Sequence, residues 1–172
     1  MEKRFILTRA NSKEPSKRKG NRMIIYIAGS FTTERERKSL EHMLELVKVE
    51  HHNDLLFIPM EQKVSRDAKK EDGSWKLSNP AWAQEVFQLD RNGLTDADRI
   101  IAMYTGHWST TGTSWEIGYA YGKGIPITLY IPEWAKEENV SLMVLNSASS
   151  WMDEQGHVHP ITFEWLNQFN QK

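Results

Sequence analysis

Two carboxylates, Glu116 and Asp90, are the side chains of this chain whose setting could support chemistry. Glu116 lies in residues 110–120, TTGTSWEIGYA, where a polar loop runs into a helix. The apolar run at residues 100–104 is typical of a buried parallel strand, and open α/β sheets bind ligands at the carboxyl ends of such strands. We therefore expect Glu116 in the first helical turn, facing a crevice, where the helix dipole favours its ionised, nucleophilic form.

The loop before Glu116 suits a ligand site. Gly112 lets the backbone approach a ligand closely, and Thr113 or Ser114 is the predicted N-cap of the helix. The alternative is that Glu116 only complements the helix dipole, as acids at helix starts commonly do. This motif alone leaves both interpretations open.

Asp90 lies in the segment FQLDRNGL, on a helix predicted over residues 82–94. Helices carry exposed acids without any catalytic role, and Asp90 taken alone fits that interpretation. Its pairing with Glu116 favours a functional one, because glycosyl transfer uses one carboxylate as the nucleophile and a second acid as the proton donor.

The composition is that of an ordinary globular protein with one domain and a formal net charge of -1. No apolar run approaches the ~18 residues of a membrane helix and no secretory signal is evident, so we expect a cytoplasmic protein without membrane association. The chain has no cysteine, which excludes disulfides, thiol nucleophiles and thiolate metal sites.

Basic residues are concentrated at the N-terminus. Residues 1–22 hold eight Lys and Arg against Glu2 and Glu14, and residues 11–22 have no apolar periodicity, which predicts a disordered extension before a domain at residues 23–172. An arm that binds nucleic acid is the alternative. The rest of the chain has 14 basic against 21 acidic residues, which favours a solvated extension, so we expect no nucleic-acid partner.

Apolar patterns after residue 22 alternate between strand and helix periodicity, the order expected of a parallel sheet. Strands are predicted at residues 23–28, 55–58, 98–104 and 125–131. Helices are predicted at residues 82–94, 140–145 and 163–169, and the helix that contains Glu116 is predicted to end at residue 122. Thr33 and Glu36 form a capping box for a further helix, whose apolar face holds Leu40, Met43, Leu44 and Val47. The polar residues 60–80 predict a substrate loop or a disordered insertion. We expect a single α/β domain, a Rossmann-like (flavodoxin-like) parallel sheet of about five strands flanked by helices.

Cofactor signatures are absent from the sequence. Residues 28–31, AGSF, lack the spaced glycines of a dinucleotide fingerprint, and no Walker loop occurs. His157 and His159 have no carboxylate partner in motif spacing, so we expect surface residues there rather than metal ligands. We expect neither a cofactor nor a metal.

Three segments in order carry a family resemblance: residues 26–31 (YIAGSF), residues 90–94 (DRNGL) and residues 112–120 (GTSWEIGYA). Over residues 23 to about 150 their order and spacing resemble the nucleoside 2-deoxyribosyltransferases. The resemblance implies double displacement at the anomeric carbon of a 2′-deoxynucleoside, with a free nucleobase as acceptor, in purine and pyrimidine salvage. Opposed carboxylates suit this reaction because its transition state has oxocarbenium character.

The resemblance also implies residue roles. Glu116 would be the nucleophile that forms a covalent deoxyribosyl intermediate, Asp90 would protonate the departing base, and Tyr26 would orient Glu116. Further substrate-binding residues would be Gly29, Ser30, Phe31, Gln62, Thr110, Gly112, Ser141 and Met143. Residues 141–143 correspond to a segment that reaches a neighbouring subunit's site, which implies a homo-oligomer, dimer-based and including hexamers.

Two departures from the family pattern keep alternatives open. Thr110 stands where the family often has an aspartate, and Ser141 stands where an asparagine typically binds the sugar 5′-hydroxyl. A serine there is similar to the 2′-deoxynucleoside 5′-monophosphate N-glycosidases, hydrolases that would use the same Glu116. Acids in residues 133–138 favour a free nucleoside if they face the pocket. A non-catalytic nucleotide-binding module is the alternative of another class.

Overall fold

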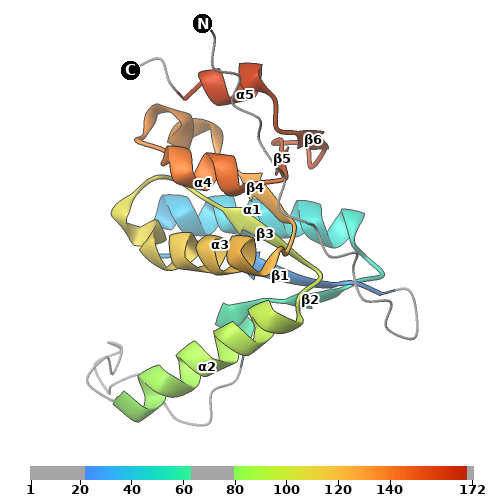
Figure 1. The fold of residues 1–172 in the computed structure, drawn as a ribbon, viewed down its shortest axis with the longest axis vertical. Coiled ribbons are helices and arrows are strands. Elements are labelled where there is room, and N and C mark those ends of the chain that lie inside the picture. The colour runs from blue at the N-terminus through green and yellow to red at the C-terminus, as the bar shows by residue number, and fades with distance from the viewer. Residues whose placement is uncertain (1–21, 63–79, 170–172) are drawn as a thin grey trace, which may run out of the picture.

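The computed structural model describes residues 22–62 and 80–169 (Figure 1). Most of the predicted N-terminal extension and of the polar segment at residues 60–80 lies outside these described residues. None of the helices that they form is long and apolar enough to cross a membrane.

The strands form one sheet in the order β2-β1-β3-β4-β5-β6. Their bounds are β1 (Ile24–Ala28), β2 (Leu55–Phe57), β3 (Arg99–Met103), β4 (Ile127–Tyr130), β5 (Ser150–Met152) and β6 (Val158–Pro160). Neighbours pair in parallel except β5 and β6, which pair antiparallel. The expected α/β fold with a mostly parallel sheet is confirmed. β5 and β6 were not predicted, because their sequences, SWM and VHP, form no apolar run, unlike the equally short β2.

Helices cover both faces of this sheet (Figure 1). They are α1 (Glu34–Glu50), α2 (Pro80–Asp96), α3 (Thr111–Lys123), α4 (Leu142–Ser147) and α5 (Phe163–Asn167), with 3-10 turns η1 (Pro59–Glu61), η2 (Trp108–Thr110) and η3 (Glu133–Glu137). Side chains of β1 alternate between two buried clusters: Ile25 and Ile27 pack with α1, whereas Tyr26 and Ala28 belong to the cluster that includes Ile117 of α3. This alternation places the Tyr26 side chain on the face that α3 covers.

The start of α1 agrees with the sequence. Thr33 is its N-cap, and Thr33 and Glu36 form both hydrogen bonds of the predicted capping box. The predicted apolar face is buried and comprises Leu40, Met43, Leu44 and Val47. Glu36 is buried as well, with only 1% of its surface exposed, although most capping-box acids lie in solvent.

The start of α3 differs from the expectation. Its N-cap is Thr110, not Thr113 or Ser114 as predicted, and Glu116 consequently lies in the second helical turn rather than the first. The 3-10 turn η2 runs directly into α3, so the backbone is already helical at residue 111. The Ser114 hydroxyl donates to the Thr110 carbonyl, a bond within the helix rather than a cap.

Helix α2 approaches β2 closely at Gly93. A Cβ atom at this position would lie 2.6 Å from the Phe57 ring, so a larger residue would push the helix away from the sheet. The Phe57 ring in turn stacks on Tyr26, with ring centroids 5.3 Å apart. Gly93 therefore helps set how near α2, and Asp90 on it, lies to Tyr26.

Candidate active site

A hydrogen bond between Tyr26 and Glu116 joins the centre of the sheet to α3. The fully buried Tyr26 hydroxyl donates to Glu116 Oε1 over 2.6 Å. Tyr26 is held by the β1 backbone and by the stacked Phe57 ring, so it has little freedom to move. The sheet therefore fixes where the Glu116 carboxyl points.

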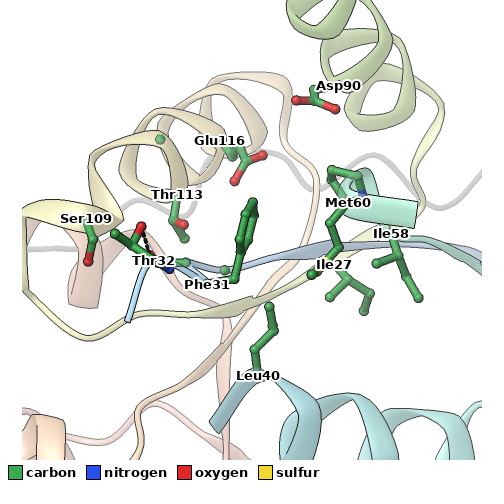
Figure 2. A pocket seen from close by; sticks show the side chains of 14 residues that line it. Ile27, Phe31, Thr32, Leu40, Ile58, Met60, Asp90, Ser109, Thr113 and Glu116 are labelled. Atoms are coloured by element: carbon green, nitrogen blue, oxygen red, sulfur yellow. Dashed lines mark hydrogen bonds between the residues drawn. The ribbon is translucent and has the colours of Figure 1, made fainter. Parts of the chain in front are cut away.

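Glu116 faces a pocket of about 280 Å³ at the carboxyl ends of β1, β2 and β3. Figure 2 shows Ser109, Thr32 and Thr113 at one end, Asp90 at the other, and Glu116 between them. The Phe31 ring lines the same pocket. The position agrees with the ligand crevices of open α/β sheets, and the lining offers two carboxyls, several hydroxyls and an aromatic face.

Burial changes the acidity of both carboxyls. It raises the pKa of Asp90 to about 6. It also raises the pKa of Glu116 to about 7; the Tyr26 hydrogen bond opposes this rise and the charge of Asp90 adds to it. The expectation that the helix dipole favours ionised Glu116 was therefore wrong. At the second turn of the helix, desolvation outweighs the dipole and raises the pKa of the carboxyl. Near neutral pH the two carboxyls hold and release protons readily, as a nucleophile and an acid must.

Tyr26 keeps its proton throughout this range. Burial and the neighbouring Glu116 carboxylate raise the pKa of the Tyr26 phenol far above its usual value. The phenol therefore remains a donor, which fixes the direction of its hydrogen bond to Glu116.

The end of the pocket that holds the hydroxyls of Ser109, Thr32 and Thr113, called the hydroxyl end below, lies against Glu36. The hydroxyls of Ser30 and Ser109, which both line the pocket, donate to the two oxygens of the Glu36 carboxylate. The sequence indicated Glu36 only as a helix cap and Ser109 not at all. The sequence did not indicate their contact because Glu36 and Ser109 are 73 positions apart and meet only where the loop after β3 folds over the start of α1.

Some of the predicted binding residues lie in the pocket wall and some do not. Those that line it are Gly29, Ser30, Phe31 and Gly112, together with Asp90 and Glu116. Gln62 Nε2 instead donates to the Ile58 carbonyl over 3.1 Å, and the buried Thr110 hydroxyl donates to the His107 carbonyl.

Ser141 and Met143 also lie outside the wall of this pocket within the single chain. Ser141 is the N-cap of α4, and Met143 on that helix is 83% exposed. A residue this exposed and apolar is available to another subunit, but contributes nothing to the pocket of its own chain.

Two expectations about charged side chains need correction. Glu133 and Lys136 line a second cavity of about 220 Å³ beside Trp151, so the acids of residues 133–138 do not carry the predicted argument against phosphate. His159 Nε2 lies 2.7 Å from Asp153, and His157 Nδ1 lies 3.3 Å from it, so both imidazoles do have a carboxylate partner. Neither this group nor any other set of three His, Asp or Glu side chains among the described residues is arranged so that it could hold a metal ion.

Tyr26→Phe should raise the pKa of Glu116 above its value of about 7, because it removes the hydrogen bond that favours the ionised carboxylate. Because the folded-state pKa of Glu116 is raised, the protonated carboxyl contributes stability that is lost as pH rises through that pKa. In the variant this loss of stability should occur at higher pH. The pKa of Glu116 is measured by carbon-13 NMR titration of labelled glutamate, with Glu116→Gln to assign its signal. Tyr121→Phe, an exposed tyrosine of α3, is the control. An unchanged or lower midpoint in Tyr26→Phe contradicts this account.

Comparison with known proteins gives a consistent result. Residues 25–154 match the family model described as nucleoside 2-deoxyribosyltransferase. The chain is 24% identical over 121 residues to a nucleoside deoxyribosyltransferase of Lactobacillus leichmannii, covering 69% of this chain and 76% of that protein. It is 25% identical over 119 residues to the Lactobacillus johnsonii enzyme of the same name, covering 68% and 78%.

Solved structures show the same fold. The 2-deoxyribosyltransferase of Bacillus psychrosaccharolyticus superposes with a TM-score of 0.63 at 22% identity, over 83% of this chain and 95% of that one. A conserved protein of Enterococcus faecalis V583 superposes with a TM-score of 0.53 at 16% identity, over 87% of each chain. The match of the family model covers most of the sheet and the whole pocket described above. This chain belongs to the nucleoside 2-deoxyribosyltransferase family.

Proposed function

We propose that this protein transfers 2-deoxyribose between nucleobases through a covalent deoxyribosyl intermediate on Glu116. The observation that carries the proposal is the Tyr26–Glu116 hydrogen bond, which holds a carboxyl toward a pocket that Asp90 also lines. Membership of the family supports the same reaction class. The domain that performs it would be residues 23–172, with residues 1–22 as an extension.

The first displacement forms the intermediate. A Glu116 carboxylate oxygen attacks the anomeric carbon C1′ of a 2′-deoxynucleoside, and the bond from C1′ to the base nitrogen breaks. The electron pair of that bond leaves with the base, which takes a proton from Asp90. Tyr26 holds Glu116 in line for this attack, and its hydrogen bond also stabilises the carboxylate when the intermediate later releases it.

The second displacement regenerates the enzyme. A nitrogen of the acceptor base attacks C1′, the bond from C1′ to Glu116 breaks, and Asp90 takes up the proton that the incoming base loses. Two inversions at one carbon give net retention of configuration. Water in place of the acceptor base would give hydrolysis, and the assay below distinguishes the two outcomes.

The pocket also suggests how the substrate lies. With C1′ at Glu116, the base extends toward Asp90 and Phe31, and the far side of the sugar extends toward the hydroxyls of Thr32 and Ser109. This orientation places the leaving nitrogen near the acid that protonates it. It also places the polar 5′ end of the sugar among side chains that can hydrogen-bond it.

Glu116→Ala should lower the rate of base exchange at least ~100-fold, because loss of the nucleophile removes several kcal/mol of barrier reduction. The assay follows conversion of deoxyinosine plus adenine into deoxyadenosine plus hypoxanthine by chromatography. Glu164→Ala, which removes an exposed acid of α5, is the matched control and should retain the full rate. Near-wild-type exchange by Glu116→Ala would falsify the assignment. Base release from monophosphates without exchange would favour the hydrolase.

Asp90→Asn should slow substrates with poor leaving groups most, because the amide keeps the size of the side chain but supplies no proton. Deoxynucleosides whose bases leave without protonation should be partly spared. The measurement is kcat/KM across bases of graded basicity, with Asp96→Asn on the same helix as control. Equal losses across the series would assign Asp90 to binding or structure instead of proton transfer.

We infer that the active form is a homo-oligomer built from dimers, in which residues 141–143 of one subunit complete the site of another. The support is the exposure of Leu142 and Met143 on α4, two large apolar side chains that lie outside the pocket of their own chain. Sedimentation velocity should show a dimer or a multiple of it, and Met143→Glu should shift it toward monomer and slow exchange. A monomer that exchanges bases at the full rate contradicts the inference.

A further inference from the structure

Glu36 places a buried negative charge directly behind the hydroxyl end of the pocket. One of its carboxylate oxygens accepts from the Ser30 hydroxyl over 3.1 Å, and from both the N–H and the hydroxyl of Thr33. The other oxygen accepts from the Ser109 hydroxyl. These bonds outweigh the burial that opposes ionisation and keep the pKa of Glu36 below its usual value.

These hydrogen bonds fix what the pocket offers to a ligand. A serine hydroxyl has one proton, and the charged Glu36 carboxylate is a stronger acceptor for the Ser30 proton than Thr32 Oγ1, which lies 3.2 Å away. Ser30 and Ser109 therefore present only lone pairs toward the pocket, and one of those on Ser30 accepts from the Thr32 N–H. His107 Nδ1, which accepts from the Ser109 N–H, lies 2.8 Å from Ser109 Oγ. Of the two acceptors near this hydroxyl, the Glu36 carboxylate is the stronger because it is charged, so the proton stays with Glu36. A ligand group that binds to these two serine oxygens must itself donate a hydrogen bond, as a hydroxyl does.

A phosphate has the opposite requirement. A phosphate needs several hydrogen-bond donors and no negative charge beside it. Proteins commonly supply such donors at the N-terminus of a helix, such as the start of α1. Here Glu36 already takes the Thr33 N–H and hydroxyl at that helix start. The described lining residues include Asp90 and Glu116 and no basic side chain. Glu36 thus takes two donors at that helix start and adds a negative charge beside those that remain.

We propose that Glu36 determines substrate specificity at this end of the pocket, where it selects a free 5′-hydroxyl and excludes a 5′-phosphate. It is a positioning residue, because it acts through the Ser30 and Ser109 hydroxyls and through its charge. The inference rests on the proposed function, which places the 5′ end of the sugar among these hydroxyls. It replaces the expectation that residues 133–138 or Ser141 alone would decide between nucleoside and nucleotide.

The test is the relative affinity for deoxyadenosine and its 5′-monophosphate, measured by calorimetry. All proteins carry Glu116→Ala, so that neither ligand is consumed. Glu36→Gln keeps the size of the side chain and can still cap α1, but it removes the charge and, with one acceptor oxygen in place of two, frees at least one serine proton. The ratio of the monophosphate Kd to the deoxyadenosine Kd should fall at least ~10-fold, given the range of such charge interactions inside proteins.

The control is Glu34→Gln, which removes an exposed charge from the same helical turn and should leave the ratio unchanged. An unchanged ratio in Glu36→Gln contradicts the role of Glu36, while base exchange by the wild-type protein still stands. Binding of neither ligand contradicts the proposed function and, with it, this inference.

Ser109→Ala decides the question should Glu36→Gln fail to fold. This variant keeps the Glu36 charge but removes one acceptor from the pocket, so deoxyadenosine should bind several-fold more weakly and the monophosphate should gain nothing. Tighter binding of the monophosphate by Ser109→Ala contradicts the proposal.

Discussion

The hydrogen bond from the Tyr26 phenol to the Glu116 carboxyl is the contact on which the rest of the site depends. Tyr26 lies on β1, in the interior of the sheet, and its ring is fixed on one side by Phe57. The bond therefore transfers the rigidity of the sheet to a carboxyl that α3 alone would leave free to rotate. A reacting carboxyl held in this way loses little entropy when it attacks.

The same burial that holds Glu116 also makes it a weaker acid, with a pKa of about 7. Two carboxyls that share a partly dry pocket oppose each other's ionisation, so near neutral pH the pair readily holds a single proton. In the free chain that proton lies on Glu116, whose pKa of about 7 exceeds the value of about 6 for Asp90 even with the Tyr26 hydrogen bond. The reaction needs the opposite assignment, an ionised nucleophile and a protonated general acid, and the Tyr26 donor lowers the cost of reaching it because it stabilises the Glu116 carboxylate.

Sequence reasoning was most successful where a local pattern decides the structure. The capping box of Thr33 and Glu36 predicted the start of α1, and apolar runs predicted the parallel strands β1 to β4. It was wrong about the cap of α3, because a 3-10 turn capped by His107 extends that helix backward. It also predicted the wrong acidity for Glu116, since desolvation depends on what packs around a side chain.

The hydroxyl end of the pocket could not be predicted because its parts come from distant loops. Glu36 and Ser109 meet only when the crossover after β3 folds over α1, and neither local sequence indicates that contact. The pairing of Asp90 with Glu116 was suggested by their residue types, and both do line one pocket. Their nearness follows from how closely α2 packs at Gly93, a property of tertiary packing.

The central claim is that Glu116 becomes covalently attached to the sugar. The most direct measurement is mass spectrometry of the wild-type protein quenched with acid while it turns over a slowly reacting 2′-deoxynucleoside without an acceptor base. The account predicts a deoxyribosyl mass increase on the peptide that contains Glu116, lost when an acceptor base is added before quenching. An unmodified Glu116 peptide in protein that is exchanging bases, or an adduct on another residue, would contradict it.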